Sequence, residues 1–147
     1  MLYPPSSGVL ALLTDFGLHD HYVGVMKGVA LSVFPGVKLV DLSHEVQAYS
    51  VEQGAFFLQQ AWLRFPPGTV FCAVIDPGVG TARRSLAGHG EERYVIAPDN
   101  GLASRAFEGR KAEVRELDED RYGIQPMSAT FHGRDLYAPS AAALASG

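Results

Sequence analysis

The chain has 147 residues, a length typical of one domain, and its 47% hydrophobic and 19% charged residues exclude a disordered protein. A formal net charge of −4 argues against a nucleic-acid partner, and the apolar run near the N-terminus is too short to span a membrane. The single cysteine, Cys72, excludes an internal disulfide. Its apolar surroundings, TVFCAVI, predict a buried thiol in a reducing, cytoplasmic compartment.

Strands and helices alternate through the first half of the chain. GVLALL is a continuous apolar run, which predicts a strand buried on both faces. Ser50 and Gln53 have the spacing of a capping box, which predicts the start of a helix. The expected ranges are 8–13, 37–42 and 69–75 for strands, and 21–34 and 51–65 for helices. This alternation favours a parallel sheet with crossover helices.

The second half contains shorter elements. Turns separate three further strands, expected at 84–90, 93–101 and 111–117. A final helix is expected over 135–147, although Pro139 is unfavourable in its first turns. The predicted fold class is therefore α/β. It comprises one domain over 1–147, with a mostly parallel sheet, crossover helices on both faces and additional short strands in the C-terminal half.

Polar side chains follow each of the first three strands, where parallel sheets bind ligands. They are Asp15, His19, Asp20 and His21 after the first strand, Asp41, His44 and Glu45 after the second, and Asp76 with a glycine loop and two arginines after the third. Each has a structural alternative as a turn former, a cap or a solvated side chain. A metal site from Asp15, His19, His21 and His44 is conceivable, although their spacing is not typical of one.

Familiar motifs account for little of this pattern. DFG occurs without the other kinase motifs, GVGTARR lacks the lysine and hydroxyl of a phosphate-binding loop, and GxGxxG is absent. A second polar cluster, FHGRD, comes late, where a loop gives way to the final helix. His132 stands there beside a glycine, and both a structural and a functional role are open to it.

Six motifs together resemble one known family, the S-adenosylmethionine hydroxide adenosyltransferases, which are relatives of the fluorinating and chlorinating enzymes. In chain order they are TDFGLHDHYVGVMKG, VDLSHEV, VEQGAFFL, FPPGTVFCAVIDPGVGTARR, APDNGL and TFHGRDLYAPSAA. The resemblance covers nearly the whole chain, and DPGVGT followed by two arginines, together with FHGRD, is specific to the family.

The resemblance implies a reaction and a set of residues. Hydroxide derived from water attacks the ribose C5′ of S-adenosylmethionine, and methionine leaves, which yields adenosine. The water-activating set falls on Asp76, Arg83 and His132, without deciding whether Asp76 or His132 is the base. Because the sulfonium of the substrate is already an excellent leaving group, no acid is needed on the leaving side, and no cofactor or metal is expected.

The resemblance also implies substrate-binding positions and an assembly. Asp15 matches an aspartate that binds the ribose hydroxyls, Asp20 a position near the methionine ammonium, and Tyr49 an aromatic along the substrate. Family members form trimers and carry a C-terminal β-rich domain, which this chain is expected to lack. Three alternatives stay open: halide as the nucleophile, a non-catalytic module that binds an adenosyl ligand, and a metal-dependent hydrolase.

Overall fold

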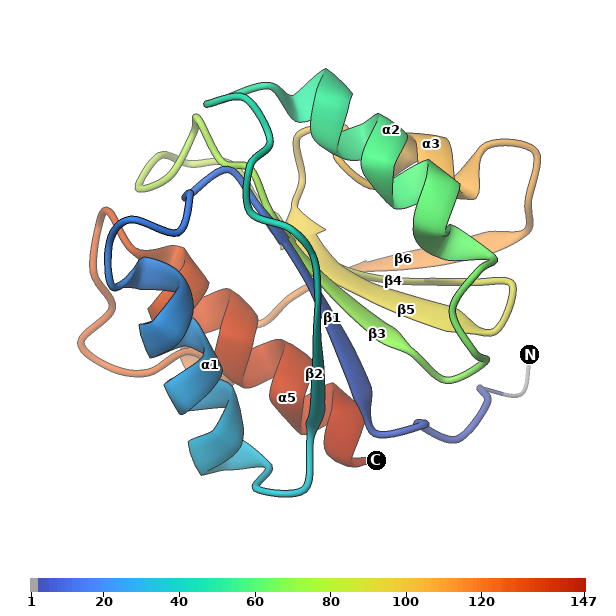
Figure 1. Ribbon diagram of the computed structural model, residues 1–147, viewed down its shortest axis with the longest axis horizontal. Helices are drawn as coiled ribbons and strands as arrows, with labels where there is room; N and C mark the ends of the chain where they lie inside the picture. Colours follow the sequence, from blue (N-terminus) through green and yellow to red (C-terminus); the bar gives the residue numbers. More distant parts are fainter. Residues whose placement is uncertain (1–2) are drawn as a thin grey trace.

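A computed structural model describes residues 3–147 and contains one six-stranded sheet (Figure 1). The strands are β1 (Val9–Thr14), β2 (Lys38–Ser43), β3 (Val70–Val74), β4 (Ser85–Gly90), β5 (Arg93–Pro98) and β6 (Ala112–Glu116). Their order is β2-β1-β3-β5-β4-β6, and β4 alone runs antiparallel to its neighbours β5 and β6. The sheet is therefore mostly parallel, as predicted.

Helices cover both faces of this sheet, which confirms the predicted fold class. They are α1 (Tyr22–Val33), α2 (Val51–Trp62), α3 (Ser104–Phe107), α4 (Glu119–Tyr122), the π-helix η1 (Gly133–Tyr137) and α5 (Ala138–Ser146). In Figure 1, α1 and α5 lie on one face, and α2 and α3 on the other. None of the helices within residues 3–147 is long and apolar enough to cross a lipid bilayer.

The central strands are apolar on both faces, which accounts for their place in the middle of the sheet. Alternate residues of β1 enter two different cores: Leu10 and Leu12 pack toward α1 and α5, while Ala11 and Leu13 pack toward α2 and α3. All four are at most 1% exposed, so the prediction of a strand buried on both faces is confirmed. Cys72 on neighbouring β3 is also fully buried, and burial raises the pKa of its thiol to about 12.

The pairing of β1 with β3 places two carboxylates at one edge of the sheet. The strands run parallel, and Thr14 lies opposite Val74 at their carboxyl ends. Asp15 follows Thr14 directly, and Asp76 follows Val74 by two residues. Carboxylates 61 positions apart in the sequence therefore emerge at the same edge, where open α/β sheets bind ligands.

The ends of the elements differ from the prediction for local reasons. The second helix ends at Trp62 rather than at residue 65. Its capping box is half formed: the Ser50 side chain accepts from the Gln53 N–H, whereas the Gln53 side chain accepts from the Gln47 N–H. The strand expected to reach residue 101 ends at Pro98. Helices α3 and α4 were not predicted, because four residues are too short to show a helical period.

The last helix begins earlier than expected, at Gly133, and starts as a π-helix. Pro139 explains the local hydrogen bonding, because it has no N–H to donate to the carbonyl of Asp135 four residues before it. The N–H of Ile124 donates to that carbonyl instead, at 2.6 Å. The carbonyl that the proline leaves free thus accepts a hydrogen bond from the preceding loop. π-helical turns are often found at functional sites.

Candidate active site

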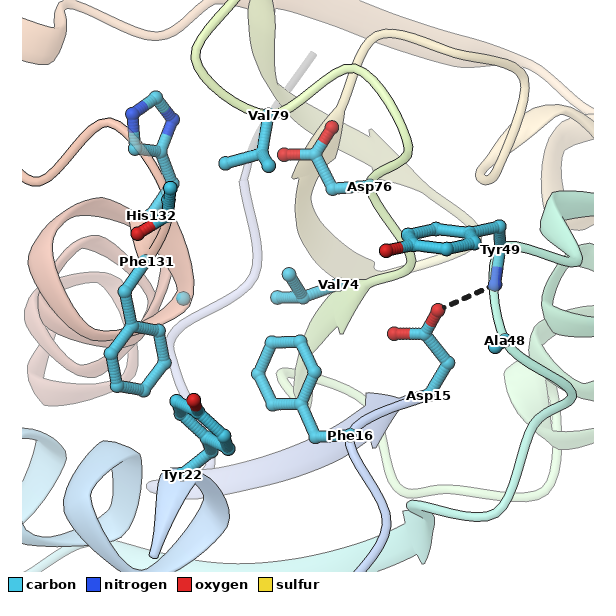
Figure 2. A pocket seen from close by; sticks show the side chains of 12 residues that line it. Asp15, Phe16, Tyr22, Ala48, Tyr49, Val74, Asp76, Val79, Phe131 and His132 are labelled. Atoms are coloured by element: carbon cyan, nitrogen blue, oxygen red, sulfur yellow. Dashed lines mark hydrogen bonds between the residues drawn. The ribbon is translucent and has the colours of Figure 1, made fainter. Parts of the chain in front are cut away.

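A pocket with a cavity volume of about 330 Å³ opens at the carboxyl edge of β1 and β3 (Figure 2). Figure 2 shows His132 and Phe131 on one side of it, Asp15 and Tyr49 on the other, and Asp76 between them. The lining residues come from four segments: Asp15, Phe16 and Tyr22; Ala48 and Tyr49; Val74, Asp76 and Val79; and Thr130 to Gly133.

The structure brings Asp76, Arg83 and His132 into one hydrogen-bonded group. Arg83 donates two parallel hydrogen bonds to Asp76, from Nε to Oδ1 at 2.9 Å and from Nη2 to Oδ2 at 2.5 Å. The same Nη2 lies 2.8 Å from Nδ1 of His132. Bidentate arginine–carboxylate pairs are geometrically specific and strong, so the three side chains hold one another in fixed orientations.

This group is nearly closed to solvent. The exposed fractions of the Asp76 and Arg83 side chains are 5% and 11%. Burial alone lowers the pKa of Arg83, but the hydrogen bonds to Asp76 and the electrostatic interactions with Tyr137, Asp76 and Glu119 together outweigh it, so the pKa is raised and the guanidinium stays charged. Asp76 and His132 line the pocket, whereas Arg83 lies behind them and is not part of the wall. Its contact with the pocket is therefore made through its two partners.

Sequence reasoning did not find the contacts on the far side of Arg83. Nη1 donates to the Ser85 hydroxyl at 3.0 Å, and that oxygen lies 2.8 Å from Glu119 Oε1 and 2.9 Å from the Tyr137 hydroxyl. Ser85 and Tyr137 stand close to the motifs already singled out. Glu119 lies in an acidic surface-like run, LDED, which carries no signal of a buried contact.

Asp15 and Tyr49 meet across two loops at the opposite wall. The backbone N–H of Tyr49 donates to Asp15 Oδ2 at 2.8 Å, and Figure 2 shows the other carboxylate oxygen directed toward the cavity. Tyr49 has a left-handed backbone, with φ of 62°, and a residue exposure of 69%. Asp20 is exposed in the loop before α1 and does not line the pocket.

An aromatic cluster, which the sequence analysis also missed, forms the floor between these walls. The ring centroids of Tyr22 and Phe131 are 5.0 Å apart, and those of Phe16 and Phe131 are 6.0 Å apart, both edge to face. All three could have been noticed as neighbours of acidic or imidazole groups, since Phe16 follows Asp15, Tyr22 follows His21 and Phe131 precedes His132. Apolar walls of this kind exclude water around a bound ligand.

A glycine brings the two halves of the site together. The loop after β3 passes so close to the segment before His132 that a Cβ on Gly80 would lie 2.4 Å from the carbonyl oxygen of Ala129. The φ of Gly80 is +76°, in the left-handed region that favours glycine. The neighbouring arginine has a separate role, because Arg84 pairs with Asp99 at 3.0 Å on the surface.

The residues of the hypothetical metal site do not gather. His44 is buried, with Nδ1 2.8 Å from the Thr14 hydroxyl and Nε2 2.8 Å from Asp41, so it supports the turn after β2. His19 and His21 are exposed on the loop before α1. Within residues 3–147, no three histidine, cysteine or acidic side chains are grouped so that they could hold a metal ion. Asp15 and these histidines therefore do not form a common ligand set.

The sequence of this chain is similar to those of several known proteins of one family and its relatives. The protein-family description "SAM hydroxide adenosyltransferase N-terminal domain" matches residues 10–147. A Thermus thermophilus protein named (R)-S-adenosyl-L-methionine hydrolase is 45% identical over 92% of this chain and 56% of its own length. A Salinispora tropica protein of the same name is 42% identical over 94% and 53%. A fluorinase from an Actinoplanes species is 33% identical over 97% and 57%.

The fold is shared with solved structures as well. The crystal structure of an uncharacterised conserved protein from Thermotoga maritima superposes with a TM-score of 0.91 at 40% identity, over 94% of this chain and 54% of that one. The chain thus spans about half the length of the curated relatives it matches. The family expected from the motifs is confirmed: this chain belongs to the SAM hydroxide adenosyltransferases and corresponds to their N-terminal domain.

Proposed function

We propose that this chain carries the water-activating part of an enzyme that hydrolyses S-adenosyl-L-methionine to adenosine and L-methionine. The supporting observation is that Asp76 and His132 border one pocket while both bind Arg83 behind it. The names of the relatives at 42–45% identity point to the same reaction and to the (R) form of the substrate. Those relatives are longer, and the matched region is 56% and 53% of their respective lengths.

The hydrogen-bond geometry supports one assignment of the proton-transfer roles. A guanidinium only donates, so Nδ1 of His132 accepts from Arg83 and the neutral ring carries its proton on Nε2. His132 is then a donor, and it orients the attacking oxygen. Each Asp76 oxygen accepts one bond from Arg83 and keeps a second lone pair for water. We therefore assign the role of proton acceptor to Asp76.

The proposed step balances without a further reactant. Water gives a proton to Asp76 while its oxygen forms a bond to the ribose C5′. The bond from C5′ to sulfur breaks, and its electron pair goes to sulfur, so methionine leaves as a neutral thioether. The proton on Asp76 passes to solvent afterwards. Holding water and carbon in line contributes as well, since well-oriented reactions gain about 7–11 kcal/mol.

The opposite wall of the pocket is the proposed substrate-binding side. The Asp15 oxygen directed into the cavity suits the ribose hydroxyls, because a carboxylate accepts two hydrogen bonds. Tyr49 lies beside it and is proposed to pack along the substrate. Asp20 is proposed to meet the methionine ammonium, since it lies on the exposed loop between Phe16 and Tyr22, two residues that line the pocket.

Localisation and assembly are also proposals. A single, fully buried and unpaired cysteine supports a cytoplasmic protein. We also propose a homo-oligomer, the trimer implied by the family resemblance. Sedimentation equilibrium of the native full-length protein measures its mass directly, and a monomer at working concentration would contradict the oligomer.

The test of the proposed function is product analysis in heavy-oxygen water with the (R) and (S) forms supplied separately. We expect adenosine and methionine from the (R) form, with solvent oxygen in the 5′-hydroxyl of adenosine. Asp76→Asn should reduce kcat about 10²- to 10⁴-fold, the usual loss of a general base. Arg84→Met, which alters only an exposed pair, is the matched control.

Three outcomes would overturn the proposal. Binding of the ligand without product identifies a binding module. A halogenated nucleoside in the presence of chloride or fluoride, in place of adenosine, identifies a halide-using relative. Loss of activity on chelation, with recovery on addition of a metal, identifies a metal-dependent hydrolase.

A further inference from the structure

The guanidinium of Arg83 is held from two sides, and only one side faces the pocket. Nε and Nη2 contact Asp76 and His132, whereas Nη1 turns away toward the Ser85 hydroxyl. The ring of Tyr137 also lies under the guanidinium, with Cζ 5.6 Å from the ring centroid. The orientation of Arg83 is therefore set as much by groups outside the pocket as by those in it.

The Ser85 hydroxyl uses its full hydrogen-bonding capacity. A hydroxyl has one proton to donate and two lone pairs to accept with. Its proton goes to Glu119 Oε1 at 2.8 Å, so Arg83 and Tyr137 must both donate to it, at 3.0 and 2.9 Å. Burial raises the pKa of the Tyr137 phenol, which keeps it protonated as this direction requires. Every bond of the group has a defined direction.

Two of these three residues are buried, and the three come from separate elements. Ser85 is 1% exposed at the start of β4, and Tyr137 is fully buried at the end of η1. Glu119 is the first residue of α4, with 35% of its side chain exposed. Buried polar groups that are fully satisfied specify a single arrangement, and a missing member leaves its partners without a bond.

The charges around Arg83 also support a role for Glu119. One cation, Arg83, lies between two carboxylates, with Glu119 Oε1 3.7 Å from Nη1 on the side opposite Asp76. When Asp76 takes a proton in the proposed reaction, Arg83 loses its partner charge on the pocket side. Glu119 then remains as the counter-charge of the guanidinium, and the buried cation is not left alone.

We propose that Ser85, Glu119 and Tyr137 are positioning residues that act through Arg83, and that they keep Asp76 and His132 in the geometry that activates water. None of them lines the pocket, so they do not contact the substrate. The inference rests on the proposed hydrolysis for its kinetic consequence, although the hydrogen-bonded arrangement itself does not.

The kinetic test uses Glu119→Gln in the native full-length protein. Glutamine keeps an oxygen for the Ser85 proton but removes the charge. We expect kcat to fall about 10- to 100-fold with KM unchanged, a range typical of misplaced or unsupported catalytic groups. Asp120→Asn removes a carboxylate from the adjacent, exposed position of α4 and is the matched control, with wild-type kinetics.

A double-variant cycle separates positioning from a general structural effect. In an Arg83→Met background, Glu119→Gln should cause no further loss, because the group through which Glu119 acts is gone. An equal additional loss in that background would refute the proposal. So would wild-type kcat in both Glu119→Gln and Ser85→Ala.

A measurement without turnover keeps the inference separate from the proposed function. Nitrogen NMR of the His132 ring, assigned by the signal lost in His132→Gln, reports whether Nδ1 accepts a hydrogen bond. Ser85→Ala should change the Nδ1 signal and Asp120→Asn should not. If wild-type protein forms no adenosine but the signal responds, the proposed function fails and the positioning role stands. An unchanged signal in Ser85→Ala refutes the positioning role.

Discussion

Two adjacent arginines, Arg83 and Arg84, offer a direct test of how burial changes the value of an ion pair. Arg83 makes two bonds to Asp76, and both side chains are nearly buried. Arg84 pairs with Asp99 at 3.0 Å, but 66% of its side chain is exposed. Replacing each arginine by methionine removes the same charge one position apart and keeps a flexible apolar stem.

The two variants should differ several-fold in their free energy of unfolding. Arg83→Met leaves the Asp76 carboxylate buried without a cation, which costs about 3–5 kcal/mol in comparable pairs. The Ser85 and His132 acceptors lose a donor in addition. Arg84→Met removes an exposed pair worth about 0–1 kcal/mol. At an m value of about 2 kcal/mol per molar, Arg83→Met should lower the urea midpoint by roughly 1.5–2.5 M.

Urea unfolding at pH 7, followed by circular dichroism, measures both variants with wild-type protein. The double variant Asp76→Asn, Arg83→Met completes the comparison, because it removes the uncompensated charge and should be more stable than Arg83→Met alone. Equal losses from the two single arginine variants would refute the reasoning. A double variant less stable than Arg83→Met would refute it as well.

Three further predictions follow from other parts of the chain. Gly80→Ala should destabilise the protein by about 1–2 kcal/mol or more in urea unfolding, because alanine resists the positive φ and its Cβ meets the carbonyl of Ala129. Arg134 and the N–H of Ser128 hold the pKa of buried Asp135 below its usual value. The ionised carboxylate therefore stabilises the folded state above about pH 4, and this stabilisation is lost as the pH falls further. Asp135→Asn should lower the free energy of unfolding by about 2 kcal/mol at pH 7 and make that free energy less dependent on pH in acid. Cys72, with a pKa of about 12, should resist iodoacetamide at pH 8 until urea unfolds the chain, and labelling of native protein at the rate of a free thiol would contradict its burial.

Sequence patterns predicted much of this architecture, because those patterns are local. Continuous apolar runs marked β1 and β3, and helical spacing marked α1 to within one residue at each end. The motifs around Asp76, Arg83 and His132 identified the family, since glycine and charged residues in fixed order are hard to produce by chance. The exact ends of the helices and strands and the two four-residue helices were missed, because a single turn of helix is too short to show a hydrophobic period.

The tertiary structure alone decided how these groups meet. Ser85 lies 34 positions from Glu119 and 52 from Tyr137, and no local pattern relates residues so far apart. The parallel pairing of β1 with β3 brings Asp15 and Asp76 to one edge, and the close pass at Gly80 completes the pocket. The sequence determines which hydrogen-bond donors and acceptors the chain contains. Packing determines which of them are buried together, and burial gives those hydrogen bonds and charges their strength.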